Sequence, residues 1–495
     1  MRYDERMSHI RELTCHIKHA SHADMELITK AYHYAERAHE SQKRASGEPY
    51  FNHVFATAKY LAELNMSPTV IAAGLLHDVI EDTGATPEEI EAIFGKEVLF
   101  LVQSVTKLGT VKYKGVERNV ENLRKFFVSM AEDLRVIVIK LADRLHNVET
   151  LQYVKPEKQR RIALETLEIY APLASRLGIG ELKGRLEDAA FPFAYPKEHA
   201  ETKKLLETRT DAHEKYLHEI DGKLKKVLKE NHVNVERVDH RVKHLYSLWK
   251  KLKRHDMDIE KVYDIIALRI IVKTTMDCWN AVGVIHSNWT ALPGRIKDYL
   301  STPKPNGYQS LHTTIFTGTG GIVEVQIRTP EMHEQAEYGI AAHFAYKEAR
   351  ALGHAVASRK EFAWIDELRK AQDELTKSNA FLERLKTDYF KDRVFIFTPI
   401  GEIMDLPEDS SAVDFAFAVH TDIGMHASGA KINGKFMPMT TKLKTNDIVE
   451  IQINPTAVPT SKWYDAAKTT NAKIKIQKYL KEHSLISKWL SFGKK

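Results

Sequence analysis

Cysteine is scarce in this chain. Its 495 residues include only two cysteines, Cys15 and Cys278, which lie far apart in the sequence. Two such residues cannot build a disulfide framework or a multi-cysteine zinc site. Because sparse cysteine is typical of proteins from a reducing compartment, we expect a cytoplasmic location.

Long apolar runs and a strong charge imbalance are also absent. No segment reaches the roughly 18 apolar residues that a membrane-spanning helix requires. The N-terminus, MRYDERMSHIRELTCHIKHA, lacks the apolar stretch of a signal peptide. A net charge of +6 permits a polyanionic ligand without requiring one. We therefore expect no membrane contact, and the length predicts two to four domains.

The apolar pattern changes several times along the chain. Segments such as HVFATAKYLAEL and DLRVIVIKLADRLHNVETL carry apolar residues at i, i+3 and i+4, which predicts helices to about residue 195. A charged helix is expected next, followed by alternating strands and helices, a polar helical stretch, a small β-rich part and a basic helical tail. The predicted parts are 1–195, 196–235, 236–346, 347–390, 391–454 and 455–495.

The segment LLHDVIEDT, residues 75–83, carries four polar residues on what we predict to be one helix face: His77, Asp78, Glu81 and Asp82. On a helical wheel these residues share an arc of roughly 140°, and the apolar residues fill the opposite arc. Gly74 falls inside the polar arc, where we expect its missing side chain to leave room for a ligand.

Two further residues can complete a metal site with this helix. His53 follows the turn SGEPY, and Asp143 lies in VIVIKLADRLHNV, a helix apolar enough to be buried. Two imidazoles and two carboxylates suit Mn²⁺, Fe²⁺ or Zn²⁺. Glu81 and Asp82 can then orient or deprotonate a metal-bound water. The alternative is that the acidic residues of this helix only pair with Arg144 and Arg124.

The motifs HDVIEDT, RASGEPYFNH, VTKLG and LADRLHN resemble the hydrolase domain of the RelA/SpoT homologue family, which makes and degrades (p)ppGpp. The resemblance implies an all-α HD-type fold and removal of the 3′-pyrophosphate from (p)ppGpp. It also implies that Glu81 and Asp82 handle the attacking water, and that Arg44 and Asn147 contact the nucleotide. The implied Mn²⁺ ligands are His53, His77, Asp78 and Asp143. The chain departs from the family pattern at Ala45, Val54 and Glu149.

A second set of polar residues lies in the alternating region. Residues 222–255 contain 11 Lys/Arg and three Asp/Glu, a local net charge of +8. Asp264 opens a predicted strand, and Glu324, Gln326 and Arg328 alternate with apolar residues on another. Two carboxylates on neighbouring strands, facing a basic pocket, suit Mg²⁺-assisted phosphoryl transfer. Alternatively, this polar face is simply solvated.

The turn-rich segment PGRIKDYLSTPKPNGYQSLHTT, residues 293–314, carries cations and an aromatic ring that can hold a phosphorylated base. The residues concerned are Lys297, Lys304, Tyr308 and His312.

This segment, with VYDIIALR and VEVQIRTPEMHEQAEYGIAAHFAYK, resembles the synthetase domain of the same family. The resemblance implies a nucleotidyltransferase-like α/β fold that transfers pyrophosphate from ATP to the 3′-hydroxyl of GDP or GTP. It implies that Asp264 and Glu324 hold Mg²⁺, with Glu324 as the base, and that Tyr308 stacks on guanine near Asn306 and His312. The implied ATP-binding residues are Arg241, Lys243 and Lys304. The tetrapeptide 295–298, RIKD, resembles the basic form found in bifunctional members.

Residues 392–453 resemble the TGS domain, a small β-grasp-like module, and His420 matches the histidine of its HTDIG motif. The resemblance implies contact with tRNA on a ribosome or with a regulatory protein, and the alternative is a structural lid. GAKINGKF, residues 429–436, only approaches a phosphate-binding loop, because Phe436 replaces the required hydroxyl and Asn433-Gly434 predicts a hairpin. The family's zinc-finger and ACT modules have no counterpart here, so the sequence does not predict full ribosome-dependent control.

The sequence therefore predicts a bifunctional (p)ppGpp synthetase and hydrolase, with residues 196–235 coupling its two sites so that one is competent when the other is not. Two alternatives remain open. One is a hydrolase whose α/β domain only senses nucleotide. The other is a ribosome- or tRNA-binding regulator with little turnover, for which steep salt dependence of RNA binding is expected.

Overall fold

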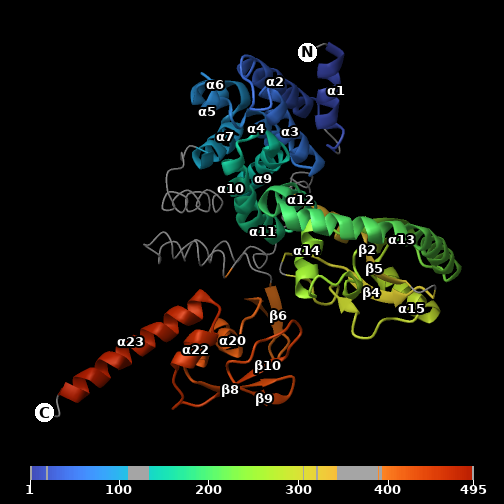
Figure 1. The fold of residues 1–495 in the computed structure, drawn as a ribbon. Helices are drawn as coiled ribbons and strands as arrows, with labels where there is room; N and C mark the ends of the chain where they lie inside the picture. The colour runs from blue at the N-terminus through green and yellow to red at the C-terminus, as the bar shows by residue number, and fades with distance from the viewer. Residues whose placement is uncertain are drawn as a thin grey trace. The chain divides into compact units, whose positions relative to one another are not determined.

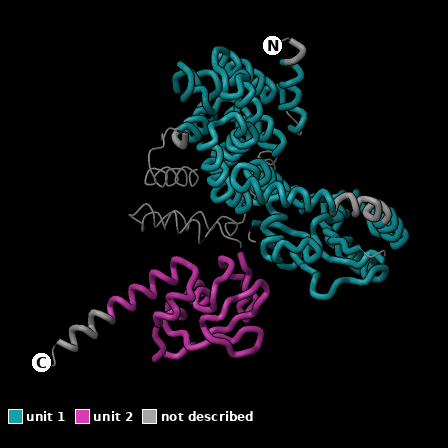
Figure 2. Tube along the Cα trace, in the orientation of Figure 1, with its two compact units in different colours: residues 1–114, 124–370 teal, residues 115–123, 371–495 magenta. Residues whose placement is uncertain are grey.

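The structure is a computed structural model that describes residues 3–17, 21–109, 133–304, 306–318, 321–342, 388 and 393–492. The chain divides into two compact units, residues 1–114 with 124–370 and residues 115–123 with 371–495 (Figure 2). The predicted linker 347–390 lies outside the described residues apart from Asp388. Among the described residues, no helix has the length and apolarity needed to cross a bilayer.

The first unit begins with helices, as the apolar periodicity predicts (Figure 1). Recognisable sequence signals mark the residues at which several of these helices begin. Ser21 caps α2 in a capping box, and proline opens α4 and α6 at positions where a missing N–H costs nothing. The bounds are α1 Tyr3–Thr14, α2 His22–Ala38, α3 Phe51–Glu63, α4 Pro68–Leu76, α5 Val79–Asp82, α6 Pro87–Phe94, α7 Lys96–Gly109 and α9 Leu134–Glu149.

The prediction of one continuous helix through residues 75–83 is wrong. Helix α4 ends at Leu76, and α5 starts at Val79. His77 and Asp78 form the junction, where the backbone of Asp78 has φ −100° and ψ −4°. This bend between two short helices, rather than a helix face, presents the two side chains.

A second group of helices follows α9. It comprises η1 Leu151–Tyr153, α10 Pro156–Glu165, the π-helical turn η2 Thr166–Tyr170, α11 Ala171–Arg176, α12 Gly180–Ala194 and α13 Pro196–Glu230. FPFAYP, residues 191–196, contains the expected break, but Pro192 stays inside α12 and the interruption is only Tyr195.

The α/β part of the first unit is a five-stranded mixed sheet in the order β1-β2-β5-β4-β3. Strands β2 and β5 pair in parallel, and the other neighbours pair antiparallel. The bounds are β1 Val235–Val242, α14 Leu245–Arg254, η3 Ile259–Lys261, β2 Ile266–Val272, α15 Thr275–Asn288, β3 Lys297–Asp298, β4 Leu311–Phe316, β5 Ile322–Arg328 and α16 Pro330–Tyr338.

The core of this α/β part includes the end of α13. Ile220, Leu224 and Leu228 on α13 are buried with the apolar residues of the sheet, α14 and α15. The last turns of the long charged helix are therefore fixed against the sheet by apolar burial.

The second unit joins a three-stranded sheet, β10-β8-β9, with the hairpin β6-β7, and Phe397 bridges to Ile448 beside β10. Asn433 and Gly434 both have positive φ, as the predicted hairpin turn requires. The bounds are β6 Arg393–Phe397, β7 Ile403–Pro407, α20 Ala412–Val419, α21 Thr421–Met425, β8 Ala427–Ile432, β9 Lys435–Met437, β10 Val449–Ile453, α22 Ser461–Ala466 and α23 Thr470–Phe492.

Buried Asp414 ties the following helical segment to this second unit. One of its carboxylate oxygens accepts hydrogen bonds from the backbone N–H groups of Lys468 and Thr469, at 2.8 and 2.7 Å. Helix α23 therefore starts from a fixed point on the β-rich module.

Candidate active sites

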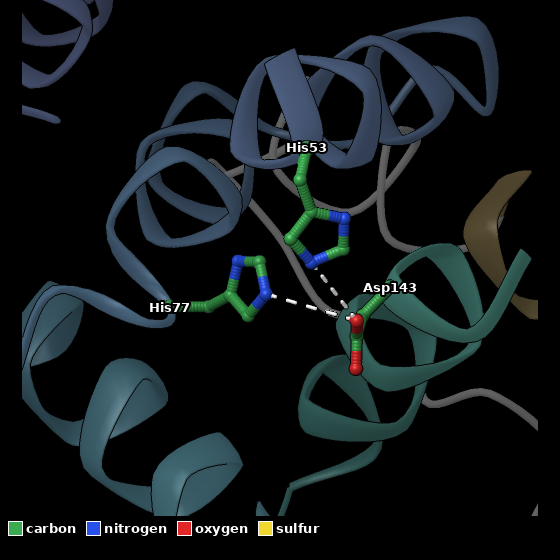
Figure 3. A group of neighbouring side chains, drawn as sticks. All are labelled: His53, His77 and Asp143. Carbon is green, nitrogen blue, oxygen red and sulfur yellow. Dashed lines mark ion pairs between the residues drawn. The ribbon is translucent and has the colours of Figure 1, made fainter. Parts of the chain in front are cut away.

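Four side chains from distant parts of the N-terminal helices converge in one place. His53 lies on α3, His77 and Asp78 lie at the α4–α5 junction, and Asp143 lies on α9. His53 Nε2 is 3.2 Å from Asp143 Oδ1 and 3.5 Å from Asp78 Oδ2. His77 Nε2 is 3.1 Å from Asp78 Oδ2 and 3.9 Å from Asp143 Oδ1. The ligand atoms of His53, His77 and Asp143 lie within 4.8 Å of one another, so these three can share a metal ion (Figure 3).

The hydrogen bonds of His77 decide what this centre can hold. Its Nδ1 lies 2.8 Å from the carbonyl oxygen of Gly74, which can only accept, so Nδ1–H is the donor. Its buried Nε2 makes no hydrogen bond and faces carboxylates. Although burial opposes it, the charge of Asp78 raises the pKa of His77 to about 9. The same negative field that attracts a proton favours a divalent cation, and this donor set suits one.

Arg44 and Asn147, predicted to contact the nucleotide, are connected to this centre. Arg44 donates to Asn147 Oδ1 at 2.6 Å, and Asn147 donates to Asp143 Oδ1 at 2.5 Å. Arg44 Nη1 and His53 Nδ1 also approach His146 Nδ1, at 2.7 and 2.9 Å. Burial lowers the pKa of His146 to about 3, so its neutral ring accepts from arginine. His53 Nε2 faces the carboxylates of Asp78 and Asp143, so this nitrogen is the one that can serve the centre.

Glu81 and Asp82 lie on α5 at the open side of the same centre. The Tyr50 hydroxyl lies 2.8 Å from Asp78 Oδ2 and 3.0 Å from Asp82 Oδ2. Burial and the charge of Asp78 raise the pKa of Glu81. Both acidic side chains remain exposed, so water can reach them.

The expectation that Gly74 leaves room for a ligand is wrong. A Cβ at Gly74 would lie 2.4 Å from Leu61 Cδ1, so this glycine allows α4 to pack against α3 and leaves no space for a ligand. Arg144 does not pair with the acids of residues 75–83. It lies 3.4 Å from Glu165 and stacks over Tyr170. Arg124 lies outside the described residues.

A cavity of about 640 Å³ lies in the α/β part of the first unit. The predicted residues of the second site all line it: Arg241, Lys243, Asp264, Lys297, Lys304, Asn306, Tyr308, His312 and Glu324. One wall comes from the preceding helices, through Ser175, Gly178, Gly180 and Lys183. The structure thus gathers this set into a single pocket.

Asp264 lies two residues before β2 rather than within the strand. Its two carboxylate oxygens are each held by an ammonium group, Oδ2 by Lys243 and Oδ1 by Lys251, both at 2.7 Å. Although burial opposes it, the charges of these lysines lower the pKa of Asp264. The carboxylate is therefore ionised and already balanced by cations.

The polar face of β5 points into the cavity, so the alternative of a solvated face is wrong. Glu324, Gln326 and Arg328 are only 6%, 5% and 0% exposed, and all three line the pocket. Glu324 Oε1 accepts a hydrogen bond from Gln326 at 2.8 Å and lies 3.4 Å from His312 Nδ1. Although burial opposes it, the interaction with His312 lowers the pKa of Glu324 to about 2.

Tyr308 lies among cations, as a base-stacking platform for a phosphorylated ligand requires. Its hydroxyl is 2.8 Å from His312 Nε2, and Lys304 Nζ is 4.8 Å from its ring centroid. Asn306 donates to the carbonyl oxygen of Ser175 at 3.0 Å, which fastens this loop to the preceding helices. Burial, followed by the charge of Lys297, lowers the pKa of Lys304 to about 8.

The sequence prediction assigned no role to several residues at these sites: Tyr50, Lys140, Lys251, Gln326 and Arg328. Lys140 Nζ lies 2.7 Å from Asp143 Oδ2, and its position three residues before that ligand was an available signal. The alternation along β5 places Gln326 and Arg328 beside Glu324. Tyr50 and Lys251 carry no local signal, because their partners are distant in sequence.

Three family models match the chain: the HD domain at residues 31–180, the region found in RelA/SpoT proteins at residues 240–351, and the TGS domain at residues 394–453. The GTP pyrophosphokinase of Myxococcus xanthus is 45% identical over 465 residues, which cover 93% of this chain and 61% of that protein. The chain belongs to the RelA/SpoT homologue family. Its fold class is the predicted one, an all-helical HD part, an α/β synthetase-type part and a TGS module.

Other RelA/SpoT relatives carry names for the opposite reaction or for both. The guanosine-3′,5′-bis(diphosphate) 3′-pyrophosphohydrolase of Aquifex aeolicus is 44% identical, covering 95% of this chain and 66% of that protein. The bifunctional (p)ppGpp synthase/hydrolase SpoT of Escherichia coli is 42% identical, covering 92% of this chain and 64% of that protein. The chain therefore spans slightly less than two thirds of these relatives' lengths.

Proposed function

We propose that this RelA/SpoT chain both makes and degrades (p)ppGpp. One observation carries the proposal: the first unit holds two separate sites, each with its predicted residues gathered together. We further propose residues 1–195 as the hydrolase part, 196–235 as the connecting helix, 236–346 as the synthetase part and 391–454 as the TGS domain.

In the hydrolase, Mn²⁺ would be held by His53, His77, Asp78 and Asp143. Bound there, the ion would lower the pKa of a water molecule and polarise the scissile phosphate. Tyr50 orients Asp78 and Asp82 through its hydroxyl, and Glu81 and Asp82 accept the proton of the attacking water. Arg44 and Asn147 lie beside the ligands and bind the nucleotide, so that the 3′-pyrophosphate faces the centre.

In the synthetase, the side chains divide between donor and acceptor nucleotides. Arg241, Lys243 and Lys304 neutralise the ATP phosphates, and Lys297 adds charge nearby. Tyr308 stacks on the guanine of GDP or GTP, with Asn306 and His312 beside it.

Asp264 and Glu324 of the synthetase would hold Mg²⁺, which would neutralise charge on the transferred group. Glu324 removes the proton from the 3′-hydroxyl. The 3′-oxygen then bonds to the β-phosphorus of ATP, the bond to the α-phosphate oxygen breaks, and AMP leaves. The ionised state of the Glu324 carboxylate supports its role as a Mg²⁺ ligand.

The TGS module is proposed to contact tRNA on a ribosome or a regulatory protein. Its His420 side chain is 65% exposed, so it is available for such a contact.

The decisive experiment assays both directions, with Mg²⁺ and Mn²⁺ supplied separately. Asp78→Ala should abolish Mn²⁺-dependent release of pyrophosphate from (p)ppGpp and leave ATP-dependent synthesis possible. Glu324→Gln should do the reverse. Hydrolysis without any synthesis from ATP and GDP would favour a hydrolase with a sensing domain. Salt-dependent RNA binding without turnover would favour a regulator.

A further inference from the structure

Five side chains in the α/β cavity form a closed circuit. Glu324 accepts from Gln326 at 2.8 Å, and Gln326 Oε1 accepts from Arg328 Nη2 at 3.0 Å. The Arg328 guanidinium carbon lies 5.5 Å from the Tyr308 ring centroid. The Tyr308 hydroxyl lies 2.8 Å from His312 Nε2. His312 Nδ1 lies 3.4 Å from Glu324 Oε1, a close contact without a hydrogen bond. Glu324, the proposed base, is thus linked to Tyr308, the proposed guanine platform, on two sides. One link runs through Gln326 and Arg328, and the other through His312.

Strand geometry builds most of this circuit. Glu324, Gln326 and Arg328 occupy alternate positions on β5, so their side chains share one face. His312 on β4 is the direct partner of Gln326 in the antiparallel pairing. Because both strands are interior to the sheet, the backbone offers the circuit little freedom to rearrange.

The charged neighbours of Gln326, Glu324 and Arg328, fix the orientation of its amide group. Arg328 can only donate, so it faces the amide oxygen. The ionised carboxylate of Glu324 can only accept, so it faces the amide nitrogen. A flipped amide would place donor against donor and acceptor against acceptor. Arg328 therefore dictates which group of Gln326 reaches Glu324.

Arg328 itself is placed to act through its neighbours. Its side chain is 0% exposed, and its Nε and Nη1 make no hydrogen bond. The nearest carboxylate that faces Nη1 belongs to Glu337, at 3.9 Å, which is beyond hydrogen-bond distance. Burying a guanidinium with unused donors is costly, so the contacts that Arg328 does make must offset this cost.

We propose that Arg328 and Gln326 are positioning residues of the transfer reaction. Through Gln326, Arg328 holds the Glu324 carboxylate in one orientation, and beneath Tyr308 it holds the platform for the acceptor base. This inference rests on the proposed synthetase function. Neither residue is assigned a contact with substrate.

The experiment measures ATP-dependent transfer to GDP by Gln326→Met, Arg328→Met and the double variant of the full chain. Gln326→Met should lower kcat by about 10–100-fold, the usual effect of losing a group that orients a metal-binding side chain, with the KM values for ATP and GDP within about twofold. Arg328→Met should lower kcat similarly and also raise the KM for GDP, because Tyr308 loses its support. Since Arg328 acts on Glu324 through Gln326, the double variant should keep the kcat of Gln326→Met.

Two further measurements separate positioning from folding damage. Arg328→Lys keeps a buried donor and should recover part of the lost kcat. In a crystal structure of Gln326→Met, the Glu324 side chain should occupy more than one rotamer, while calorimetry should show unchanged GDP affinity. Arg237→Met serves as the matched control, because Arg237 is exposed on β1 and outside the cavity.

Three results would overturn the inference: wild-type kcat in Gln326→Met, kcat losses that multiply in the double variant, or an unmoved Glu324 with weakened GDP binding. Failure of the proposed function looks different, because the wild-type chain would then show no transfer at all.

Discussion

Arg185 and Asp188 lie three residues apart on α12 and bind different halves of the first unit. Arg185 donates to Glu63 on α3 at 3.1 Å and to Glu149 on α9 at 3.0 Å. Those two helices carry His53 and Asp143. One short stretch of α12 therefore contacts the scaffold of the proposed metal centre.

The next turn of the same stretch holds the start of α14. Asp188 Oδ1 accepts from the backbone N–H of Tyr246 at 3.0 Å, and Asp188 Oδ2 lies 2.8 Å from His244 Nδ1. Helix α14 also carries Lys251, which holds Asp264. Helix α12 is thus a direct physical connection between the two sites (Figure 1).

We expect α12 to transmit coupling between hydrolysis and synthesis. In the wild-type background, His77→Ala should change the rate of synthesis by about 5–150-fold, the range typical of coupled sites. In an Arg185→Ala background the same substitution should have a much smaller effect, because α12 loses its ion pairs with Glu63 on α3 and Glu149 on α9. The measurement is the rate of synthesis in the wild type, His77→Ala, Arg185→Ala and the double variant.

A surface substitution on α13, within the predicted connector 196–235, serves as the control for Arg185→Ala. Lys203 on α13 is 61% exposed and pairs only loosely with Glu207, at 3.9 Å. Lys203→Met should leave the effect of His77→Ala unchanged. An identical effect of His77→Ala in the Arg185→Ala and wild-type backgrounds would refute a role for α12.

The second prediction concerns Lys304 and pH. Its pKa of about 8 lies below the ordinary 10.5, so the folded, ligand-free protein loses this charge as the pH rises through 8. Because an anionic nucleotide favours the protonated amine, nucleotide affinity should be highest below pH 8 and fall above it. Lys304→Arg keeps its charge and should flatten this dependence between pH 7 and 9. Calorimetric titration across this range measures both curves, and parallel curves would contradict the assignment.

The third prediction concerns Tyr50, which touches two acids of the proposed metal centre without being a ligand. Tyr50→Phe should weaken Mn²⁺ binding or hydrolysis by about 10–100-fold, because Asp78 and Asp82 lose their shared hydrogen-bond donor. Manganese titration of hydrolysis, with calorimetry, measures the effect. Tyr153→Phe is the control, since Tyr153 is 52% exposed. Unchanged Mn²⁺ affinity and hydrolysis in Tyr50→Phe would show that this hydroxyl orients nothing.

The fourth prediction tests the wall shared by the helices and the cavity. Gly178 has φ +77°, and a Cβ there would lie 2.9 Å from the backbone oxygen of Asn306. Gly178→Ala should therefore cost about 1–3 kcal/mol of unfolding free energy and raise the KM for GDP by displacing the Asn306 loop. Denaturant unfolding and synthesis kinetics measure the two effects.

Gly222→Ala provides the control for this substitution. Gly222 lies inside α13 with nothing within 4 Å of an added Cβ, so alanine should stabilise the chain by about 0.5–1 kcal/mol. Wild-type stability and KM in Gly178→Ala would show that the close approach has no consequence.

Local sequence patterns predicted the helices and strands better than they predicted the contacts between these elements. The periodicities of α3 and α9 and the alternation of β5 follow from burial of one face, which the sequence records directly. The break at His77-Asp78 was missed, because a helical wheel assumes a continuous helix. The role of Gly74 was misread, because Leu61 comes from another helix and leaves no mark in the segment LLHDVIEDT.

The same limit applies to the candidate sites. His53, His77 and Asp143 could be grouped because imidazoles and carboxylates among apolar helices are chemically conspicuous. In the sequence, Tyr50 and Lys251 resemble ordinary surface residues. Only the fold places Asp78 and Asp82 beside Tyr50, and Asp264 beside Lys251. The direction of the Gln326 amide is different, because the neighbours that set it, Glu324 and Arg328, lie two positions away on the same strand and follow from its alternation.

The pair of lysines on Asp264 has a consequence for the order of binding in the proposed synthetase. A cation arriving alone would have to compete with two ammonium groups for the same carboxylate. A bound triphosphate would offer Lys243 and Lys251 new anionic partners, which would free the carboxylate of Asp264. Mg²⁺ and nucleotide should therefore bind together, and the protein without nucleotide should bind Mg²⁺ only weakly.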